Sequence, residues 1–234
     1  MTTSALIASE VEIERLAQKF EKSSVEEILE WAADRFDSHL MMTSSFGAEG
    51  IVLIDKLARI APDTPIVYLD TGFHFAETED LKERMRTRYG LKIIEQRAEL
   101  TIERQDAIFG DRLYERDPDL CCKMRKVEPL REALLGYHAW ISALRRDQSP
   151  TRASIKKVEW NAKHGLVKIN PLTDWTRRDV WDYILKHRLP YNRLHDEGYS
   201  SIGCKPCTQP TTIGSHERSG RWSGHRKLEC GIHL

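Results

Sequence analysis

The stretch HLMMTSSFGAEG, residues 39–50, joins a short apolar run to a loop of small and hydroxylated residues. The apolar run at residues 39–42 predicts a buried strand, and residues 43–50 predict a tight loop. Residues 51–60 then repeat apolar side chains at helical intervals, and the helix that they predict ends before two prolines. A strand that leads through such a loop into a helix is the repeating unit of a parallel sheet, so this stretch decides the fold class.

The rest of the first half repeats this alternation. Residues 66–69 predict a second buried strand, residues 77–89 a charged helix, and residues 91–95 a third strand. Ahead of them, residues 10–36 show apolar side chains at helical spacing. Strands that alternate with helices in this way predict an α/β fold with a doubly wound, mostly parallel sheet.

The second half continues the pattern less regularly. Residues 121–135 predict a helix and residues 139–144 a strand, while residues 158–160 and 167–169 are expected to pair around a turn. The motif Thr176-Arg177-Arg178-Asp179 has the form of a capping box, which predicts the start of another helix.

Residues after Pro190 are rich in glycine, proline and serine, which predicts irregular structure. The sequence has no internal repeat, no low-complexity tract and no linker between domains. We therefore expect a single domain over residues 1–234, with N-terminal helices over about residues 1–36 and a mobile tail over about residues 208–234. Within the tail, RSGRWSGHRK carries four basic residues and no acidic one, which is typical of an anion-binding segment.

Charge and hydropathy exclude several classes of protein. The 36 lysines and arginines balance the 36 aspartates and glutamates, so no net charge attracts the chain to nucleic acid or to a membrane. No apolar run approaches the roughly 18–20 residues that span a bilayer. The N-terminus MTTSALIASEVEIERL lacks the basic and continuous apolar regions of a secretory signal. We therefore expect a cytoplasmic protein, whose five cysteines are not a disulfide framework.

Two of the predicted loops are suited to an anion. The first, from Ser44 to Gly50, offers two hydroxyls and leads into a helix N-terminus. The second, Leu69-Asp70-Thr71-Gly72, ends the second predicted strand, and ligands of open parallel sheets bind at the carboxyl ends of strands. Neither loop matches the kinase-type GxxxxGK[ST] or the dinucleotide-binding GxGxxG pattern. Taken alone, both loops are equally compatible with ordinary tight turns.

Four of the five cysteines fall into two pairs. Cys121 and Cys122 are adjacent, while Lys205-Pro206 separates Cys204 from Cys207. Adjacent side chains on a helix diverge by roughly 100°, which suits one tetrahedral zinc ion poorly. A 4Fe-4S cluster offers a separate iron to each thiolate, so diverging neighbours can both reach it. The pattern thus favours a 4Fe-4S cluster, with zinc as the second possibility and unreactive buried cysteines as the third.

The fifth cysteine, Cys230, lies in the motif ECGIH near the end of the sequence. His225, Arg226, Lys227 and His233 lie within five residues of it, and nearby positive charge favours the nucleophilic thiolate. The following glycine would let the sulfur move between a substrate and an external partner. Cys230 is therefore a candidate nucleophile; the alternative is a cysteine without function at a frayed terminus.

Taken together, the motifs SSFGAEG, LDTGFHFAET, CCKMRKVEPL, GCKPCT and ECGIH resemble the iron–sulfur branch of the sulfonucleotide reductases, which act on adenosine 5'-phosphosulfate (APS) or its 3'-phosphorylated form (PAPS). The resemblance extends from Ser44 to His233. It implies a sheet of the N-type ATP pyrophosphatase, or adenine nucleotide alpha hydrolase-like, kind. It also implies a 4Fe-4S cluster on Cys121, Cys122, Cys204 and Cys207.

The resemblance further implies a reaction and its partners. Cys230 would attack the sulfur of APS, release AMP and become a cysteine S-sulfonate. Thioredoxin or a similar dithiol donor would then release sulfite, as in assimilatory sulfate reduction. The family also implies a homo-oligomer. The substrate contacts that the resemblance implies are Ser44, Ser45, Phe46, Gly47, Leu69, Asp70, Thr71, Gly72, Lys126, Arg145, Arg146, Arg218, Arg221 and His233.

Several alternatives remain open at this stage. The same reaction on PAPS or on both substrates is the nearest, followed by a zinc-containing, ATP-dependent ligase or thiolase of the same fold. A nucleotide sensor without catalytic activity is the third. We expect His164, His187 and His195 to be ordinary loop or helix-end histidines, and the tryptophans of the apolar segments to lie in the core.

Overall fold

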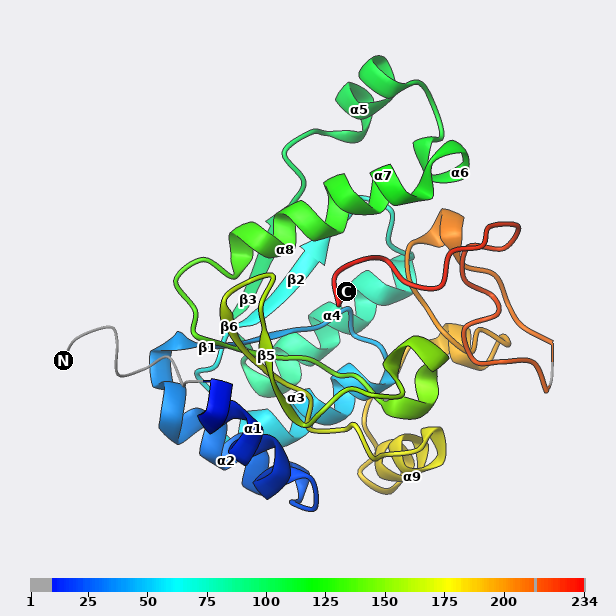
Figure 1. Cartoon of the computed structure of the whole chain (residues 1–234). Helices are drawn as coiled ribbons and strands as arrows, with labels where there is room; N and C mark the ends of the chain where they lie inside the picture. Colours follow the sequence, from blue (N-terminus) through cyan, green and yellow to red (C-terminus); the bar gives the residue numbers. More distant parts are fainter. Residues whose placement is uncertain (1–9, 213, 234) are drawn as a thin grey trace.

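The computed structural model describes residues 10–212 and 214–233. A six-stranded sheet in the order β3-β2-β1-β4-β6-β5 forms its centre, and helices cover both faces (Figure 1). Residues 1–9 of the predicted N-terminal segment, and residues 213 and 234 of the predicted tail, lie outside the described residues.

Five of the six strands run parallel, and only β5 runs antiparallel to its neighbour β6. The doubly wound, mostly parallel sheet expected from the sequence is therefore confirmed, as is the predicted pairing of residues 158–160 with residues 167–169. The strands are β1 Leu40–Thr43, β2 Ile66–Asp70, β3 Ile93–Arg97, β4 Ala139–Ile141, β5 Val158–Asn161 and β6 Leu166–Ile169.

Alternate side chains of the strands enter two separate apolar cores. Leu40 and Met42 of β1 pack into the larger core, whereas Met41 between them packs into the smaller one. Likewise, Trp140 of β4 faces the smaller core while its two neighbours face the larger. Because successive side chains point to opposite faces of a strand, a sheet covered on both sides needs continuous apolar runs. The uninterrupted run LMM in β1 meets that requirement.

The larger core lies against the N-terminal helices and α9, and the smaller core lies under α8. The helices of the first half are α1 Glu10–Phe20, α2 Val25–Phe36, α3 Ala48–Ile60, α4 Ala76–Tyr89 and α5 Ile102–Phe109. The later ones are α6 Leu113–Arg116, α7 Pro118–Cys122, α8 Glu128–Ala133 and α9 Arg177–Lys186. Short 3₁₀ turns are η2 Asp37–His39, η4 Arg146–Gln148, η5 Pro150–Arg152, η6 Arg193–His195 and η7 Lys205–Cys207.

The helix predicted over residues 121–135 is continuous but not uniform. A π-helical segment, Lys123–Val127, lies between α7 and α8. Such segments widen a helix locally and occur often at functional sites. This one directly follows the adjacent cysteines Cys121 and Cys122, so it sets the direction in which the next side chains point.

Beyond residue 190 the described residues form only 3₁₀ turns and one isolated bridge, between Thr208 and Arg221. This agrees with the irregular structure that the sequence predicts there. The C-terminal segment, red in Figure 1, folds back toward the carboxyl ends of the strands. Whether it moves remains a prediction. Among the helices of the described ranges, none combines the length and the apolar character needed to cross a bilayer.

Helix α9 begins with the capping box expected from the sequence. Thr176 Oγ1 accepts a hydrogen bond from Asp179 N at 3.2 Å, and Asp179 Oδ2 accepts one from Thr176 N at 2.7 Å. Val180 and Ile184 then anchor the helix in the larger core.

Thr176→Ala should lower the free energy of unfolding by about 1 kcal/mol, because the amide of Asp179 loses its acceptor, Thr176 Oγ1. Urea denaturation of the variant should show a lower midpoint at an unchanged slope. Thr87→Ala, at an exposed position inside α4, is the matched control and should not lower the midpoint. Equal midpoints for Thr176→Ala and the parent would refute the capping role.

Candidate active site

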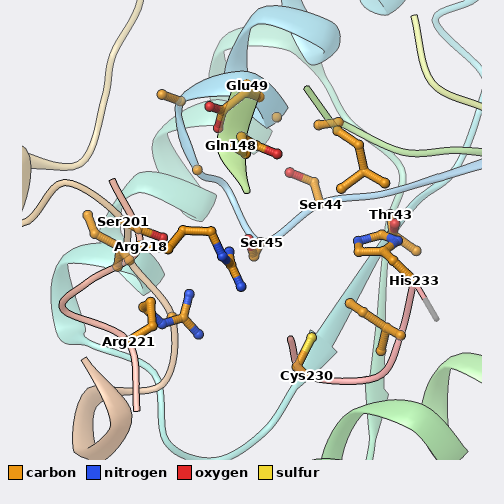
Figure 2. Close-up of a pocket in the computed structure, with 18 of the residues that line it drawn as sticks. Thr43, Ser44, Ser45, Glu49, Gln148, Ser201, Arg218, Arg221, Cys230 and His233 are labelled. Atoms are coloured by element: carbon orange, nitrogen blue, oxygen red, sulfur yellow. The ribbon is translucent and has the colours of Figure 1, made fainter. Parts of the chain in front are cut away.

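A cavity lies at the carboxyl ends of β1, β2 and β4, and the C-terminal segment closes one side of it. The loop after β1 contributes Ser44 and Ser45, and the turn after β2 contributes Leu69 and Thr71. Figure 2 shows Ser45 facing the side chains of the C-terminal segment, with Cys230 among them. Three parts of the chain that are far apart in sequence therefore form one site.

The loop after β1 leaves the N-terminus of α3 open. Ser44 Oγ accepts a hydrogen bond from Phe46 N at 3.0 Å, which curls the loop, and Phe46 adopts a φ of 54°. Gly47 is the N-cap of α3 and provides no side-chain cap, so the first amides of the helix are available to an anion. Ser44, Ser45 and Gly47 line the cavity as expected. The ring of Phe46 instead packs in the larger core, edge-on to Tyr68.

Some residues of the turn after β2 line the cavity, and the others fix the conformation of the turn. Leu69 and Thr71 line the cavity, whereas Asp70 and Gly72 form the turn. Asp70 accepts a hydrogen bond from Gly72 N at 2.9 Å and pairs with Arg97 at 2.9 Å. Gly72 has a φ of 73°, and a Cβ there would approach Ile102 to 2.9 Å, so only glycine fits.

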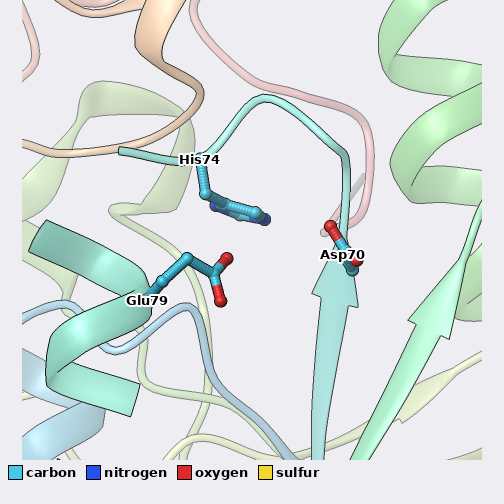
Figure 3. Close-up of side chains that lie close together, drawn as sticks. All are labelled: Asp70, His74 and Glu79. Atoms are coloured by element: carbon cyan, nitrogen blue, oxygen red, sulfur yellow. The ribbon is translucent and has the colours of Figure 1, made fainter. Parts of the chain in front are cut away.

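A histidine and two carboxylates brace this turn (Figure 3). Ligand atoms of Asp70, His74 and Glu79 lie within 4.8 Å of one another. Each has a protein partner: His74 Nε2 lies 2.9 Å from Leu69 O, and Glu79 accepts a hydrogen bond from the Tyr68 hydroxyl at 2.6 Å. Burial lowers the pKa of His74, so its ring is neutral at neutral pH. These contacts give the cluster a structural role.

The four paired cysteines line a second, smaller cavity beside the first. Cys121 and Cys122 come from α7, Cys204 is the N-cap of η7, and Cys207 is its last residue. The structure therefore brings together all four residues that the sequence suggested as ligands.

The thiols of these cysteines are near enough to influence one another electrostatically. Within the described residues, the only three candidate ligand atoms that lie within 4.8 Å of one another belong to Asp70, His74 and Glu79. A tetrahedral zinc ion with Zn–S bonds of about 2.3 Å would hold its sulfurs about 3.8 Å apart. The four cysteines form no such group of three, whereas a 4Fe-4S cluster would offer a separate iron to each thiolate.

Burial and mutual repulsion disfavour the thiolates of this cavity. Burial, followed by the neighbouring thiols, raises the pKa of Cys121 to about 12 and that of Cys207 to about 11. Cys204 differs: burial alone would raise its pKa, but the charge of Lys126 and a contact with Thr71 Oγ1 at 3.4 Å hold it below its ordinary value. Lys126 thus provides the largest compensating charge for Cys204.

Lys126 belongs to both cavities. It lies in the π-helical segment, one turn beyond Cys122. Burial disfavours its ammonium group, but the thiols of Cys204 and Cys230 outweigh that effect and raise the pKa of Lys126. Lys126 therefore stays cationic between the cysteine cavity and the candidate nucleophile.

Neither Arg145 nor Arg146 lines the cavity. The side chain of Arg145 is completely buried and pairs with Glu49 at 2.9 Å, Glu217 at 2.7 Å and Asp147. Arg146 points away and pairs with Glu21 at 2.6 Å. The structure does not bring these two predicted contacts to the site.

The C-terminal segment supplies Arg218, Arg221 and Cys230 to the cavity. The guanidinium of Arg221 lies 4.6 Å from the ring centre of Trp222, and none of the described carboxylates pairs with it. It also packs against Gly203, where any side chain would collide with it. The glycine of GCKPCT thus makes room for Arg221, which remains an available cation.

His233 also lines the cavity, as the sequence suggested. Its ring stacks on Trp140 with centroids 5.3 Å apart and planes 11° from parallel. Burial, together with the positive charge of Lys168, holds the pKa of His233 well below its ordinary value. The ring is therefore neutral at neutral pH.

Sequence reasoning missed several residues of the cavity. His195, expected to be an ordinary histidine, lines it, and its buried Nε2 has no hydrogen-bond partner among the described residues. Trp181 was expected in the core but reaches the cavity as well. No local pattern marks these positions, since the fold brings them to the site from separate segments. The further lining residues include Glu49, Gln148, Arg152, Arg177, Ser201 and Glu217.

Relatives of the chain are named for one reaction type. An adenosine 5'-phosphosulfate reductase of Geobacillus kaustophilus (strain HTA426) is 50% identical over 209 residues, 89% of each chain. A phosphoadenosine 5'-phosphosulfate reductase of Gloeobacter violaceus (strain ATCC 29082 / PCC 7421) is 48% identical over 224 residues, 94% of this chain and 93% of that protein.

Solved structures agree with this grouping. The phosphoadenylyl-sulfate (PAPS) reductase of Candida auris, in a phosphate complex, has a TM-score of 0.78 at 31% identity and covers 86% of this chain and 98% of its own. An FMN adenylyltransferase of Candida glabrata, at 17% identity and a TM-score of 0.59 over 97% of this chain and 80% of its own, shares the fold alone. Residues 39–210 match the family model described as the phosphoadenosine phosphosulfate reductase domain, and the chain belongs to that family.

Proposed function

We propose that the chain is an adenylyl-sulfate reductase that reduces APS to sulfite and AMP in sulfate assimilation. The observation that carries the proposal is the position of Cys230, in one cavity with the open N-terminus of α3 and with Lys126 and Arg221. A nucleophile beside two cations and a helix N-terminus suits a substrate whose reacting group is an anionic phosphosulfate. Relatives about 50% identical are named for this reaction.

Some of the cations in and near the cavity are paired with carboxylates, and others are not. Within the cavity, Arg152 pairs with Glu229. Arg145 lies outside the cavity lining and pairs with Glu49 and Glu217. Lys126 and Arg221 pair with no described carboxylate, so their charges are available to the substrate. We propose that these two side chains hold the phosphosulfate and stabilise the charge that leaves with AMP.

The first chemical step is a displacement at sulfur. The Cys230 thiolate attacks the sulfur atom of APS, an S–S bond forms, and the bond between that sulfur and the bridging oxygen breaks. AMP leaves with the electron pair, and Cys230 carries an S-sulfonate. Lys126 and Arg221 act here by stabilising the negative charge of the departing phosphate.

The second step needs an external dithiol, for which we propose thioredoxin or a similar protein. One donor thiolate attacks Cys230 Sγ, and sulfite leaves with the bonding electrons. The second donor thiol then resolves the mixed disulfide, so that the donor becomes oxidised by two electrons. Since Cys230 must reach a separate protein, we propose that the tail moves between the two steps. We also propose that the enzyme is cytoplasmic and a homo-oligomer.

We propose a 4Fe-4S cluster in the cysteine cavity. The donor set supports it, because four largely buried thiols line one cavity, and a cluster offers a separate iron to each of them. Cys121, Cys122, Cys204 and Cys207 would be the ligands. Once bound, the cluster would fix α7 against η7 and set the electrostatic environment of Lys126.

Cys230→Ser should abolish sulfite release, because a serine hydroxyl is not ionised at neutral pH and cannot replace the thiolate. With APS and no reductant, the parent should gain the mass of one sulfonate, and the variant should gain none. Iron content, roughly four atoms per chain, and APS binding should be equal in the two proteins. Continued turnover by the variant would contradict the assigned role.

The second candidate function is the same reaction on PAPS, which the Gloeobacter violaceus relative's name favours. Turnover with APS and with PAPS at equal concentration, with thioredoxin as donor, separates the two. We expect the higher kcat/KM with APS. A higher kcat/KM with PAPS would assign the chain to the other substrate, and activity with neither would reject the reductase altogether.

Arg221→Ala should lower kcat/KM for APS roughly 30- to 150-fold, the loss of about 2–3 kcal/mol for a charged hydrogen bond. Arg146→Ala is the matched control, since the guanidinium of Arg146 pairs with Glu21 outside the cavity, and it should change kcat/KM less than about threefold. Steady-state kinetics of both variants checks this assignment. The reverse order of effects would show that Arg146, not Arg221, serves the substrate.

A further inference from the structure

Glu229, the residue immediately before Cys230, is a buried carboxylate with an unusual number of partners. It is 7% exposed. Arg152 holds it with two bonds, from Nε at 2.8 Å and from Nη2 at 2.7 Å. Hydroxyls of Thr151 at 3.0 Å and Ser149 at 3.2 Å donate to the same carboxylate, and Arg218 adds a contact at 3.3 Å.

Most of these partners belong to one element of the scaffold. Ser149, Thr151 and Arg152 lie in and beside η5, in the segment that follows β4. A two-bond arginine–carboxylate pair is strong and fixed in direction. The pair of Glu229 with Arg152 therefore fixes the backbone beside Cys230 relative to η5.

A different anchor holds the other side of Cys230. Ile232 packs against the smaller apolar core, and His233 stacks on Trp140. The candidate nucleophile thus lies between a charged anchor and an apolar one. Each nitrogen of the Arg152 guanidinium already donates a hydrogen bond to Glu229 or Gln148, so few donors remain for a substrate anion. Arg218 differs, because its Nε is buried without a hydrogen-bond partner among the described residues.

We infer that Glu229 is a positioning residue for Cys230: its pairing with Arg152 latches the C-terminal segment shut and so delivers the thiol to the cavity. The inference rests on the proposed function for the identity of the nucleophile. The latch itself rests on the contacts of Glu229. Burial alone would raise the pKa of Glu229, but the hydrogen bonds and charge of Arg152 hold it below its ordinary value, so the carboxylate is ionised at neutral pH.

Alkylation of Cys230 by iodoacetamide in the intact protein, without substrate, measures how often the latch opens. Glu229→Gln keeps the shape of the side chain and removes its charge. It should raise the alkylation rate of Cys230 roughly tenfold or more, which corresponds to about 1.4 kcal/mol in the closing equilibrium. Glu197→Gln, an exposed position in another loop, is the matched control and should leave the rate unchanged. A parental rate for Glu229→Gln would overturn the latch.

A second set of variants keeps the test decisive if Glu229→Gln folds poorly. Arg152→Lys retains the charge but loses the two-bond geometry, so its alkylation rate should lie above that of the parent. The double variant Glu229→Gln/Arg152→Gln should show a rate well below the product of the two single effects, because both changes break the Arg152–Glu229 pair. A double variant whose effect is the product of the single effects would refute direct coupling.

The alkylation assay also separates this inference from the proposed reaction. A faster rate in Glu229→Gln, in a chain that does not reduce APS, would support the latch and reject the reductase. An unchanged alkylation rate in a Glu229→Gln variant that still reduces APS would reject the latch and support the reductase. For an active enzyme, we expect Glu229→Gln to slow formation of the S-sulfonate in a single turnover and to leave the thioredoxin-dependent step at its parental rate.

Discussion

The site depends on the interaction of one buried cation, the ammonium group of Lys126, with the cysteines on either side of it. An ammonium group away from bulk water is stable only where acceptors or opposite charges replace its hydration. Lys126 meets this condition with sulfur: Cys204 on one side and Cys230 on the other favour its charged form. The π-helical segment makes this possible, since Lys126 follows the cysteine pair on the same helical stretch. Lys126 therefore interacts both with the cysteine cavity and with Cys230, the candidate nucleophile.

The roles of the other cations follow from their partners and not from their distance to the cavity. Arg145 is fully committed to Glu49 and Glu217, so its charge stabilises the wall of the cavity. Arg152 is committed to Glu229. Arg221 has an aromatic ring and a glycine beside it and pairs with no carboxylate of the described residues, which suits it to an incoming anion. An arginine that already has a carboxylate partner cannot take up an anionic substrate without leaving that carboxylate unpaired.

Features set by local interactions could be predicted from the sequence, whereas those set by contacts between distant segments could not. Strand and helix positions came from apolar periodicity, which is local, and both sides of β1 needed apolar residues because the sheet is covered twice. The four paired cysteines were found because their spacing carries chemistry. Arg145 could not be separated from substrate-facing arginines, since its partner Glu217 lies far along the chain. The cavity positions of His195 and Arg152 depend on packing that no motif records.

The two anchors around Cys230 differ in a way that bears on how the tail can open. The contact of Ile232 and His233 with the smaller core and Trp140 is apolar and aromatic, so its strength depends little on charge in the cavity. The contact of Glu229 with Arg152 and Arg218 is ionic, so it responds to any anion that enters beside it. A negatively charged group near Arg218 competes with the carboxylate for the same guanidinium. An S-sulfonate on Cys230, as proposed above, would place such an anion beside the ionic contact and would leave the apolar contact unchanged, so the pairing of Glu229 is the one of the two anchors that the proposed intermediate would weaken.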